Sequence, residues 1–265
     1  MPNTTNEVAY KEQLIRLLLF PLEIAGIENQ DSKNFDEDYR KRLKFQFITD
    51  WKRYRACVDL IEDTECAIDN FFQYQLGDLS RENRSLGEKY LRLYGILNAV
   101  YLQMSGFVEL MKLINYPYHK DISRLFEQSD TYKLRNIAGA HTVDYAFDKD
   151  FDKLKSTGRK KTSFRIMQSD LEETGSKITT IDENGVKLQF NMLDILGKYE
   201  RNSTDIIVKL VRYLLGTLII RKEDKNKVED RVKILLNNLL DYSTIDKNRD
   251  YFEKQFKEIK RKYSI

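Results

Sequence analysis

Apolar residues recur at helical spacing along most of the chain. The repeat is clearest in residues 36–76 and 88–114, and no glycine or proline interrupts the first of these segments. Residues 36–76 are enough for one very long helix or for two helices in tandem, and the pattern leaves both open. Further helices are predicted at 7–26 with an interruption at Pro21, and at 121–127, 130–141, 192–221, 225–240 and 249–263.

The apolar period changes from helical to alternating in one short part of the chain. Residues 164–169 alternate, and residues 177–182 and 186–191 flank a Glu-Asn-Gly sequence at 183–185, which is typical of a hairpin turn. Residues 147–163 have no apolar period and are expected to form a mobile loop. We therefore expect a small antiparallel meander inserted into a mainly helical chain.

These elements predict the fold class and the division of the chain. About seven helices with one β-hairpin form a helical bundle, because apolar helix faces need neighbouring helices to cover them. With 265 residues the chain is long enough for one large domain, 1–265. We expect the bundle core at about 36–221, the loop and β insertion at about 148–191, and two C-terminal helices within 225–263.

Composition, charge and the cysteines add four expectations. Glycine (11) and proline (3) are scarce, which favours helix. The 45 basic and 42 acidic residues nearly balance, so a polyanionic partner must bind a local patch. Charged residues interrupt the most apolar stretches, so we expect no membrane-spanning helix. Cys57 and Cys66 lie nine residues apart in one predicted helix and cannot bridge each other, so we expect a soluble, cytoplasmic protein with reduced thiols.

Motifs of several common enzyme classes are absent. The chain contains no GxxxxGK[ST] phosphate loop, no GxGxxG, no GxSxG and no HExxH, which excludes standard nucleotide kinases, dehydrogenases and zinc proteases. The aspartates within 148–152 resemble the start of a calcium loop. However, Lys153 replaces the required glycine and Arg159 falls where a bidentate glutamate should be. We expect neither a metal nor another cofactor.

The chain has two histidines, so a histidine-based mechanism has two candidates. His119 follows a Tyr-Pro-Tyr sequence and is interpreted as an ordinary turn histidine. His141 ends the run Lys-Leu-Arg-Asn-Ile-Ala-Gly-Ala-His at 133–141, with Arg135 six residues before it and Asn136 next to that arginine. This run resembles the Arg-x(4 to 6)-His motif of the HEPN superfamily, in which an arginine and a polar residue precede an alanine-flanked histidine.

The helix predicted before this motif is also similar to HEPN proteins. Residues 90–103 are rich in tyrosine and leucine, as is the corresponding helix in some bacterial members. The resemblance implies a HEPN-like helical bundle, metal-independent endoribonuclease activity, and a composite site across a symmetric dimer. The helical order compatible with that fold spans about 36–221.

The residue types fit RNA cleavage on physical grounds as well. The reaction needs a base for the 2′-hydroxyl, an acid for the leaving 5′-oxygen and a cation for the charge that develops on the phosphate. Histidine titrates near neutrality, so His141 can act as base or acid. Arg135 can grip phosphate oxygens, and Asn136 can position phosphate or sugar by hydrogen bonds. Arg135, Asn136 and His141 are therefore the candidate catalytic residues.

The same chemistry favours a homodimer. One histidine cannot conveniently serve both sides of one phosphate, whereas a two-fold dimer presents two copies of each residue in one cleft. On an ideal helix, six residues place Arg135 and His141 about 120° apart. Either Gly139 loosens the helix, or the two side chains flank a groove that the partner protomer completes, and the sequence leaves both open.

Residues downstream of the motif are candidates for substrate binding. Tyr145 lies four residues after His141 and would share its helix face, with packing as the alternative role. In one subfamily a tyrosine two residues after the histidine is modified by a nucleotidyltransferase partner, and the different offset here means that this modification is not expected. A basic run that could bind RNA backbone, or form a solvated loop, includes Lys155, Arg159, Lys160 and Lys161. The many tyrosines and phenylalanines recur at helical spacing and are interpreted as core.

These observations lead to one functional hypothesis and two rivals. The leading hypothesis is a HEPN-type ribonuclease, a toxin or antiphage-defence effector whose partners are RNA, a second copy of the chain, and an antitoxin or other regulatory protein. The first rival is a non-catalytic HEPN-like module that binds RNA, a nucleotide or a protein partner. The second is an unrelated helical scaffold in which the motif is accidental.

Overall fold

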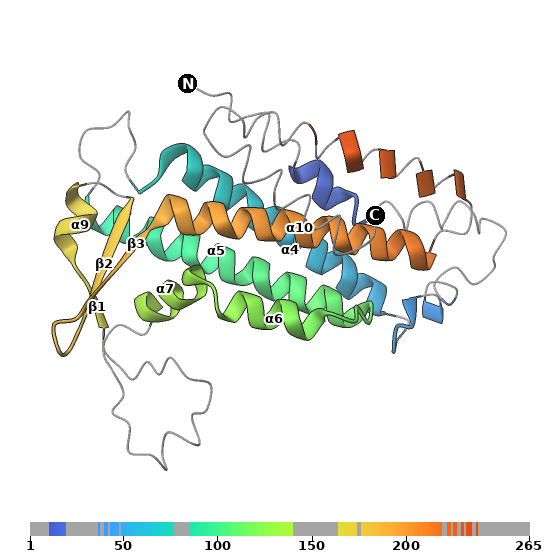
Figure 1. Cartoon of the computed structure of the whole chain (residues 1–265), viewed down its shortest axis with the longest axis horizontal. Helices are drawn as coiled ribbons and strands as arrows, with labels where there is room; N and C mark the ends of the chain where they lie inside the picture. Colours follow the sequence, from blue (N-terminus) through green and yellow to red (C-terminus); the bar gives the residue numbers. More distant parts are fainter. Residues whose placement is uncertain are drawn as a thin grey trace, which may run out of the picture. The chain divides into compact units, whose positions relative to one another are not determined.

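A computed structural model describes most of the helical part of the chain and the small sheet (Figure 1). The described residues are 11–19, 37, 40, 41, 43–47, 49–76, 85–139, 164–173, 176–218, 222, 223, 225, 226, 229, 230, 232–234 and 237. Within them the protein is mainly helical with a three-stranded antiparallel sheet, which confirms the predicted fold class. None of the described helices is both long and apolar enough to cross a membrane.

The chain divides into two compact units. Unit 1 contains Met1–Trp51 and Thr204–Ile265, and unit 2 contains Lys52–Ser203. In unit 1, apolar residues of segment 11–19 are buried, in agreement with the helix predicted there to pack inward. Also in unit 1, Arg212 forms an ion pair of 3.4 Å with Glu229. The prediction of a single domain stays a prediction.

The long segment 36–76 forms two helices in tandem, which decides between the two open alternatives. Helical residues within 37–43 are followed by Lys44, whose positive φ of 56° interrupts the helix. Helix α4 (Asp50–Tyr74) then begins, and the carboxylate of Asp50 accepts the backbone N–H of Phe47 at 2.9 Å. An aspartate can satisfy such a backbone donor at a helix start, so the new helix needs no glycine or proline before it.

Helix α5 (Leu86–Leu113) begins with a capping box. The Ser85 hydroxyl accepts the backbone N–H of Glu88 at 3.3 Å, and the Glu88 carboxylate accepts the backbone N–H of Ser85 at 3.2 Å. Asn115 follows the helix with a φ of 53°, so α5 ends just before Pro117, where the sequence predicted its end.

Helices α6 (His119–Glu127) and α7 (Asp130–Gly139) pack against α5 in unit 2 (Figure 1). The rings of Phe107 and Phe126 join α5 to α6, with centroids 6.2 Å apart. Helices α4 and α5 approach closely at Gly106, because an added Cβ there would lie 3.2 Å from Cγ1 of Ile61. Only glycine permits this approach without a shift of the neighbouring side chain.

A buried polar network crosses the core of unit 2. The Gln103 amide nitrogen on α5 donates to the Ile61 carbonyl at 3.0 Å and to the Glu65 carboxylate at 2.9 Å, and both acceptors lie on α4. The Tyr199 hydroxyl donates to the Gln103 amide oxygen at 2.7 Å from the first part of α10 (Met192–Leu218). Gln103 and Glu65 are both 0 % exposed, so no water replaces these bonds.

The sheet follows the predicted meander. Strands β1 (Phe164–Ile166), β2 (Lys177–Asp182) and β3 (Lys187–Asn191) pair in that order, and both pairs are antiparallel. The turn between β2 and β3 contains Gly185 with a φ of 83°. A short helix that the sequence analysis did not predict, α9 (Gln168–Glu173), connects β1 to β2, because six residues are too few to show a helical period.

Candidate functional site

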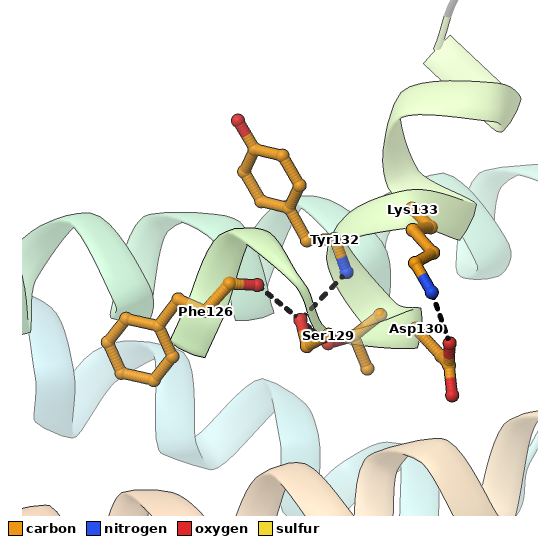
Figure 2. A network of polar contacts seen from close by, with 6 residues as sticks. Phe126, Ser129, Asp130, Tyr132 and Lys133 are labelled. Atoms are coloured by element: carbon orange, nitrogen blue, oxygen red, sulfur yellow. Dashed lines mark hydrogen bonds and ion pairs between the residues drawn. The ribbon is translucent and has the colours of Figure 1, made fainter. Parts of the chain in front are cut away.

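The candidate site begins with the connection between α6 and α7. Figure 2 shows the Ser129 hydroxyl between the Phe126 carbonyl, to which it donates at 2.6 Å, and the Tyr132 backbone N–H, which it accepts at 3.2 Å. The Thr131 hydroxyl lies 3.0 Å from the Ser129 oxygen, and it must be the donor there because Ser129 gives its only hydrogen to Phe126. Ser129 is therefore the N-cap of α7 and fixes the direction in which this helix leaves α6.

Helix α7 has one face in the core and one face at its edge. Leu134, Ile137 and Ala138 are buried, whereas Arg135 and Asn136 are half-buried. The buried face anchors the helix on α5, so the two predicted catalytic side chains lie where the core meets solvent. Such a position lets a side chain be oriented by its neighbours and still reach a ligand.

Arg135 is held by two neighbours. Its Cζ atom lies 4.1 Å from the centroid of the Tyr101 ring on α5, and its Nη1 donates to the Asn136 side-chain oxygen at 3.1 Å. A guanidinium over an aromatic face gains roughly 0.5–1 kcal/mol at a partly exposed site. Because the described residues use one of the five N–H donors of Arg135, the others can bind an anion such as a phosphate.

A second tyrosine completes this cluster. The Tyr132 ring on α7 lies 6.1 Å from the Tyr101 ring between centroids, with an interplanar angle of 40°. Both tyrosines are half-buried, so they lie at the edge of the core. Aromatic residues were predicted to belong to the core. We use the name Arg135 cluster for the four residues Arg135, Asn136, Tyr101 and Tyr132.

Only part of the Arg135 cluster could be predicted from the sequence. Arg135 and Asn136 were each predicted as catalytic residues, and the hydrogen bond between their side chains was not predicted. Tyr132 precedes them by three and four positions on α7, and that helical spacing is a signal in the sequence. The contact of Tyr101 with Arg135 depends on how α5 packs against α7, so no local pattern indicates it.

Most other predicted site residues lie outside the described residues. His141, the predicted general acid or base, and Tyr145 fall in segment 140–163, as does the basic run. The structure therefore does not place His141, Tyr145, Lys155, Arg159, Lys160 or Lys161, and their roles stay predictions. Gly139 is the last residue of α7 that the structure describes, so the question of a loosened helix at Gly139 also stays open.

His119 has a local structural contact. It begins α6, and its Nδ1 lies 2.9 Å from the Tyr116 carbonyl oxygen, so Nδ1 carries the hydrogen in this contact. This agrees with its interpretation as a turn histidine. Among the described residues, no group of three histidine, cysteine or acidic side chains is arranged to hold a metal ion.

The Gln103 network is a second polar cluster, but its position does not suit a substrate site. Burial, with smaller contributions from the Glu200 and Glu65 carboxylates, raises the pKa of the Tyr199 hydroxyl well above its usual value. Each of the three polar groups of Gln103, Glu65 and Tyr199 bonds to another member of the network. We interpret the network as a fixed link between helices.

Comparison of the chain with models of protein families, with curated proteins and with solved structures found no match. The Arg135 cluster and the sequence motif around it are therefore the features that bear on function.

Proposed function

We propose that the protein is a metal-independent endoribonuclease of the HEPN type, with Arg135, Asn136 and His141 of two protomers in one composite site. The observation that carries this proposal is the position of Arg135, which lies at the edge of the core with its guanidinium supported by Tyr101 and Asn136. An arginine held in this way is preorganised to bind a phosphate, because its orientation does not have to be fixed again when the substrate arrives.

The proposed reaction is attack of the ribose 2′-hydroxyl on the adjacent phosphorus. One His141 takes the hydroxyl proton while the new 2′-oxygen–phosphorus bond forms, and the bond from phosphorus to the 5′-oxygen breaks. The second His141 gives a proton to that leaving oxygen, which yields a 2′,3′-cyclic phosphate and a 5′-hydroxyl. Arg135 stabilises the charge on the phosphate oxygens, and Asn136 orients phosphate or sugar.

The two histidines of the chain allow a matched experiment. The wild type, His141→Gln and His119→Gln are purified and incubated with single-stranded RNA in EDTA, and folding is compared by circular dichroism. The wild type and His119→Gln should cut, whereas His141→Gln should lose cleavage by about a hundredfold or more, since it lacks the acid–base group. Equal cleavage by both variants, or no cleavage by the wild type in EDTA, contradicts the proposal.

Arg135→Lys tests the phosphate-binding role separately. Lysine keeps the charge but loses the planar fork and its contact with Asn136, so we expect slower cleavage with folding unchanged. The dimer is tested by sedimentation at several protein concentrations, where a monomer that cuts RNA at full rate would contradict the composite site. If RNA binds and is not cut by any form of the protein, the non-catalytic module is the better description.

A further inference from the structure

The three-stranded sheet has two chemically different faces. Because side chains alternate along a strand, the register of the strands assigns each residue to one face. On the first face Ile166 pairs with Thr180, and Ile178 pairs with Phe190, and all four residues are buried. This face supplies the apolar side chains that the insertion contributes to the core of unit 2.

The opposite face is polar and carries three cations. Arg165 on β1, Ile181 on β2 and Lys187 on β3 form one row across the sheet, and Lys177 lies on the same face four residues before Ile181. We call this the basic face, and its members are Arg165, Lys177, Thr179, Ile181, Lys187, Gln189 and Asn191. It contains no acidic residue.

The charged side chains of the basic face are accessible. Arg165, Lys177, Lys187 and Gln189 are exposed, whereas Thr179 between them is 2 % exposed. A ligand would therefore contact the long side chains around Thr179. Within the part of the chain that the structure describes, none of the three cations forms an ion pair.

Other charged groups in the described residues are arranged differently. Lys133 pairs with Asp130 at 3.2 Å, Lys233 pairs with Asp230 at 3.1 Å, and Arg53 pairs with Glu109. Asp182, at the end of β2, lies on the first face and uses its carboxylate to accept the backbone N–H groups of Asn184 and Val186. The strand residues of the basic face therefore carry charge of one sign, in a chain whose total charges nearly cancel.

The spacing of the three cations favours an extended polyanion. Strands lie about 4.8 Å apart, so Arg165 and Lys187 are about 9–10 Å apart across the sheet. Lys177 lies about 13–14 Å from their row along β2, at about 3.4 Å per residue. These are backbone spacings. A chain of phosphates can contact three cations spread over such distances while each side chain stays near its own strand, whereas one small anion would require all three side chains to converge.

We propose that the basic face binds the phosphate backbone of single-stranded RNA, with Arg165, Lys177 and Lys187 as phosphate contacts and Gln189 as a hydrogen-bonding neighbour. The choice of RNA rests on the proposed function, and charge complementarity supports the binding itself. A competing explanation is protection of the sheet edges, because lysine on an edge strand prevents pairing with other chains. That explanation covers Arg165 on β1 and Lys187 on β3, which are both edge strands, but not Lys177, since β2 is the central strand.

Binding is measured by fluorescence anisotropy with a labelled 2′-O-methyl RNA of mixed sequence, which cannot be cut because its 2′-oxygen carries no proton. The test variant is Arg165→Gln/Lys177→Gln/Lys187→Gln. The matched control is Lys112→Gln/Lys120→Gln/Lys198→Gln, which removes the same charge from exposed helix positions in unit 2. Circular dichroism and thermal unfolding show whether both variants keep the fold.

The test variant should bind about tenfold or more weakly, while the control should stay within about twofold of the wild type. Three lost phosphate contacts should also reduce the slope of log affinity against log salt by about 2, at roughly 0.7 for each contact with a single strand. Equal losses in both variants would assign the effect to net charge and overturn the proposal. Unchanged binding by the test variant, or no binding by the wild type, would overturn it too.

This outcome can be separated from that of the proposed function. If only the test variant loses binding but His141→Gln still cuts RNA like the wild type, the basic face stands and the nuclease assignment fails. If cleavage depends on His141 but the test variant binds normally, the nuclease stands and the basic face fails. Binding of the wild type to vesicles with anionic lipid, without binding to RNA, would assign the basic face to a membrane surface and overturn the proposal.

Discussion

Replacing Tyr199 by phenylalanine removes one oxygen atom from the buried network of unit 2. The ring remains and keeps its contact with Phe126, whose centroid lies 6.1 Å away. The lost bond is the 2.7 Å contact from the Tyr199 hydroxyl to the Gln103 amide oxygen. Because Gln103 is fully buried, its oxygen would have no water to bond instead.

The expected cost follows from that orphaned acceptor. A buried group left without its hydrogen bond costs about 1–3 kcal/mol, so Tyr199→Phe should lower the free energy of unfolding by this amount. Gln103→Leu should cost more, about 3 kcal/mol or above, because it also removes the donor to the buried Glu65 carboxylate. The double variant should be less destabilised than the sum, by about 1 kcal/mol, since both changes break the same bond.

Urea unfolding followed by far-UV circular dichroism measures these free energies. The single tryptophan, Trp51, lies in the first turn of α4, so its fluorescence reports on the helix that carries Ile61 and Glu65 and gives a second probe of the same transition. A loss below about 0.3 kcal/mol for Tyr199→Phe, or strict additivity in the double variant, would refute the network as a set of mutually dependent bonds.

The same variant changes the response to alkaline pH. Burial raises the pKa of Tyr199 well above its usual value, so the folded protein keeps the hydroxyl neutral while an unfolded tyrosine ionises near pH 10. The resulting stability is complete below about pH 10 and is lost as the pH rises further. Above about pH 10 the free energy of unfolding of Tyr199→Phe should therefore fall less steeply with pH than that of the wild type. Tyr54 contributes to the dependence that remains, because burial also raises its pKa.

Three further predictions concern α7, its support and the cysteines. Tyr101→Leu should slow RNA cleavage about two- to fivefold because Arg135 loses the ring that holds it, and Tyr101→Phe should cut at the wild-type rate because it keeps the ring. A Tyr101→Phe variant as slow as Tyr101→Leu would contradict positioning of Arg135 by the ring. Ser129→Ala should lower the free energy of unfolding by about 1–2 kcal/mol through loss of the N-cap, and no change in urea unfolding would count against it. Burial, with a smaller contribution from Glu109, raises the pKa of the Cys57 thiol to about 11. At pH 8 a maleimide should therefore label Cys66 in the native protein and Cys57 only after unfolding. Labelling of the native Cys66→Ser variant would show that Cys57 is not buried.

The sequence predicts much of the fold because local signals agree with the final packing. The capping residues Ser85 and Glu88 and the turn glycine Gly185 each satisfy backbone groups within a few residues. The break at Lys44 was harder to place, because the residue adopts a positive φ without the glycine that usually indicates one. Helix α9 was missed for lack of length.

The candidate site is less accessible to sequence reasoning than the fold. Arg135 and Asn136 could be selected from the sequence because they belong to one short motif, but the hydrogen bond between their side chains was not predicted. The contact with Tyr101 joins residues 34 positions apart and depends on helix packing. The two faces of the sheet became clear only with the register of β1 against β2, because the predicted meander gives the order of the strands but not which residues of β1 and β2 lie opposite each other.

The hydrogen bonds that meet at Gln103 limit how unit 2 can deform. Sliding α5 by one helical turn would carry the Gln103 amide about 5.4 Å away from its partners, so α4, α5 and the first part of α10 have to travel together as one rigid frame. Among the described parts of unit 2, α7 and the sheet lie outside this frame and can move relative to it. The distance between a probe on α4 and a probe on α5 should stay constant during such a motion, and the distance from α5 to a probe on β3 should change.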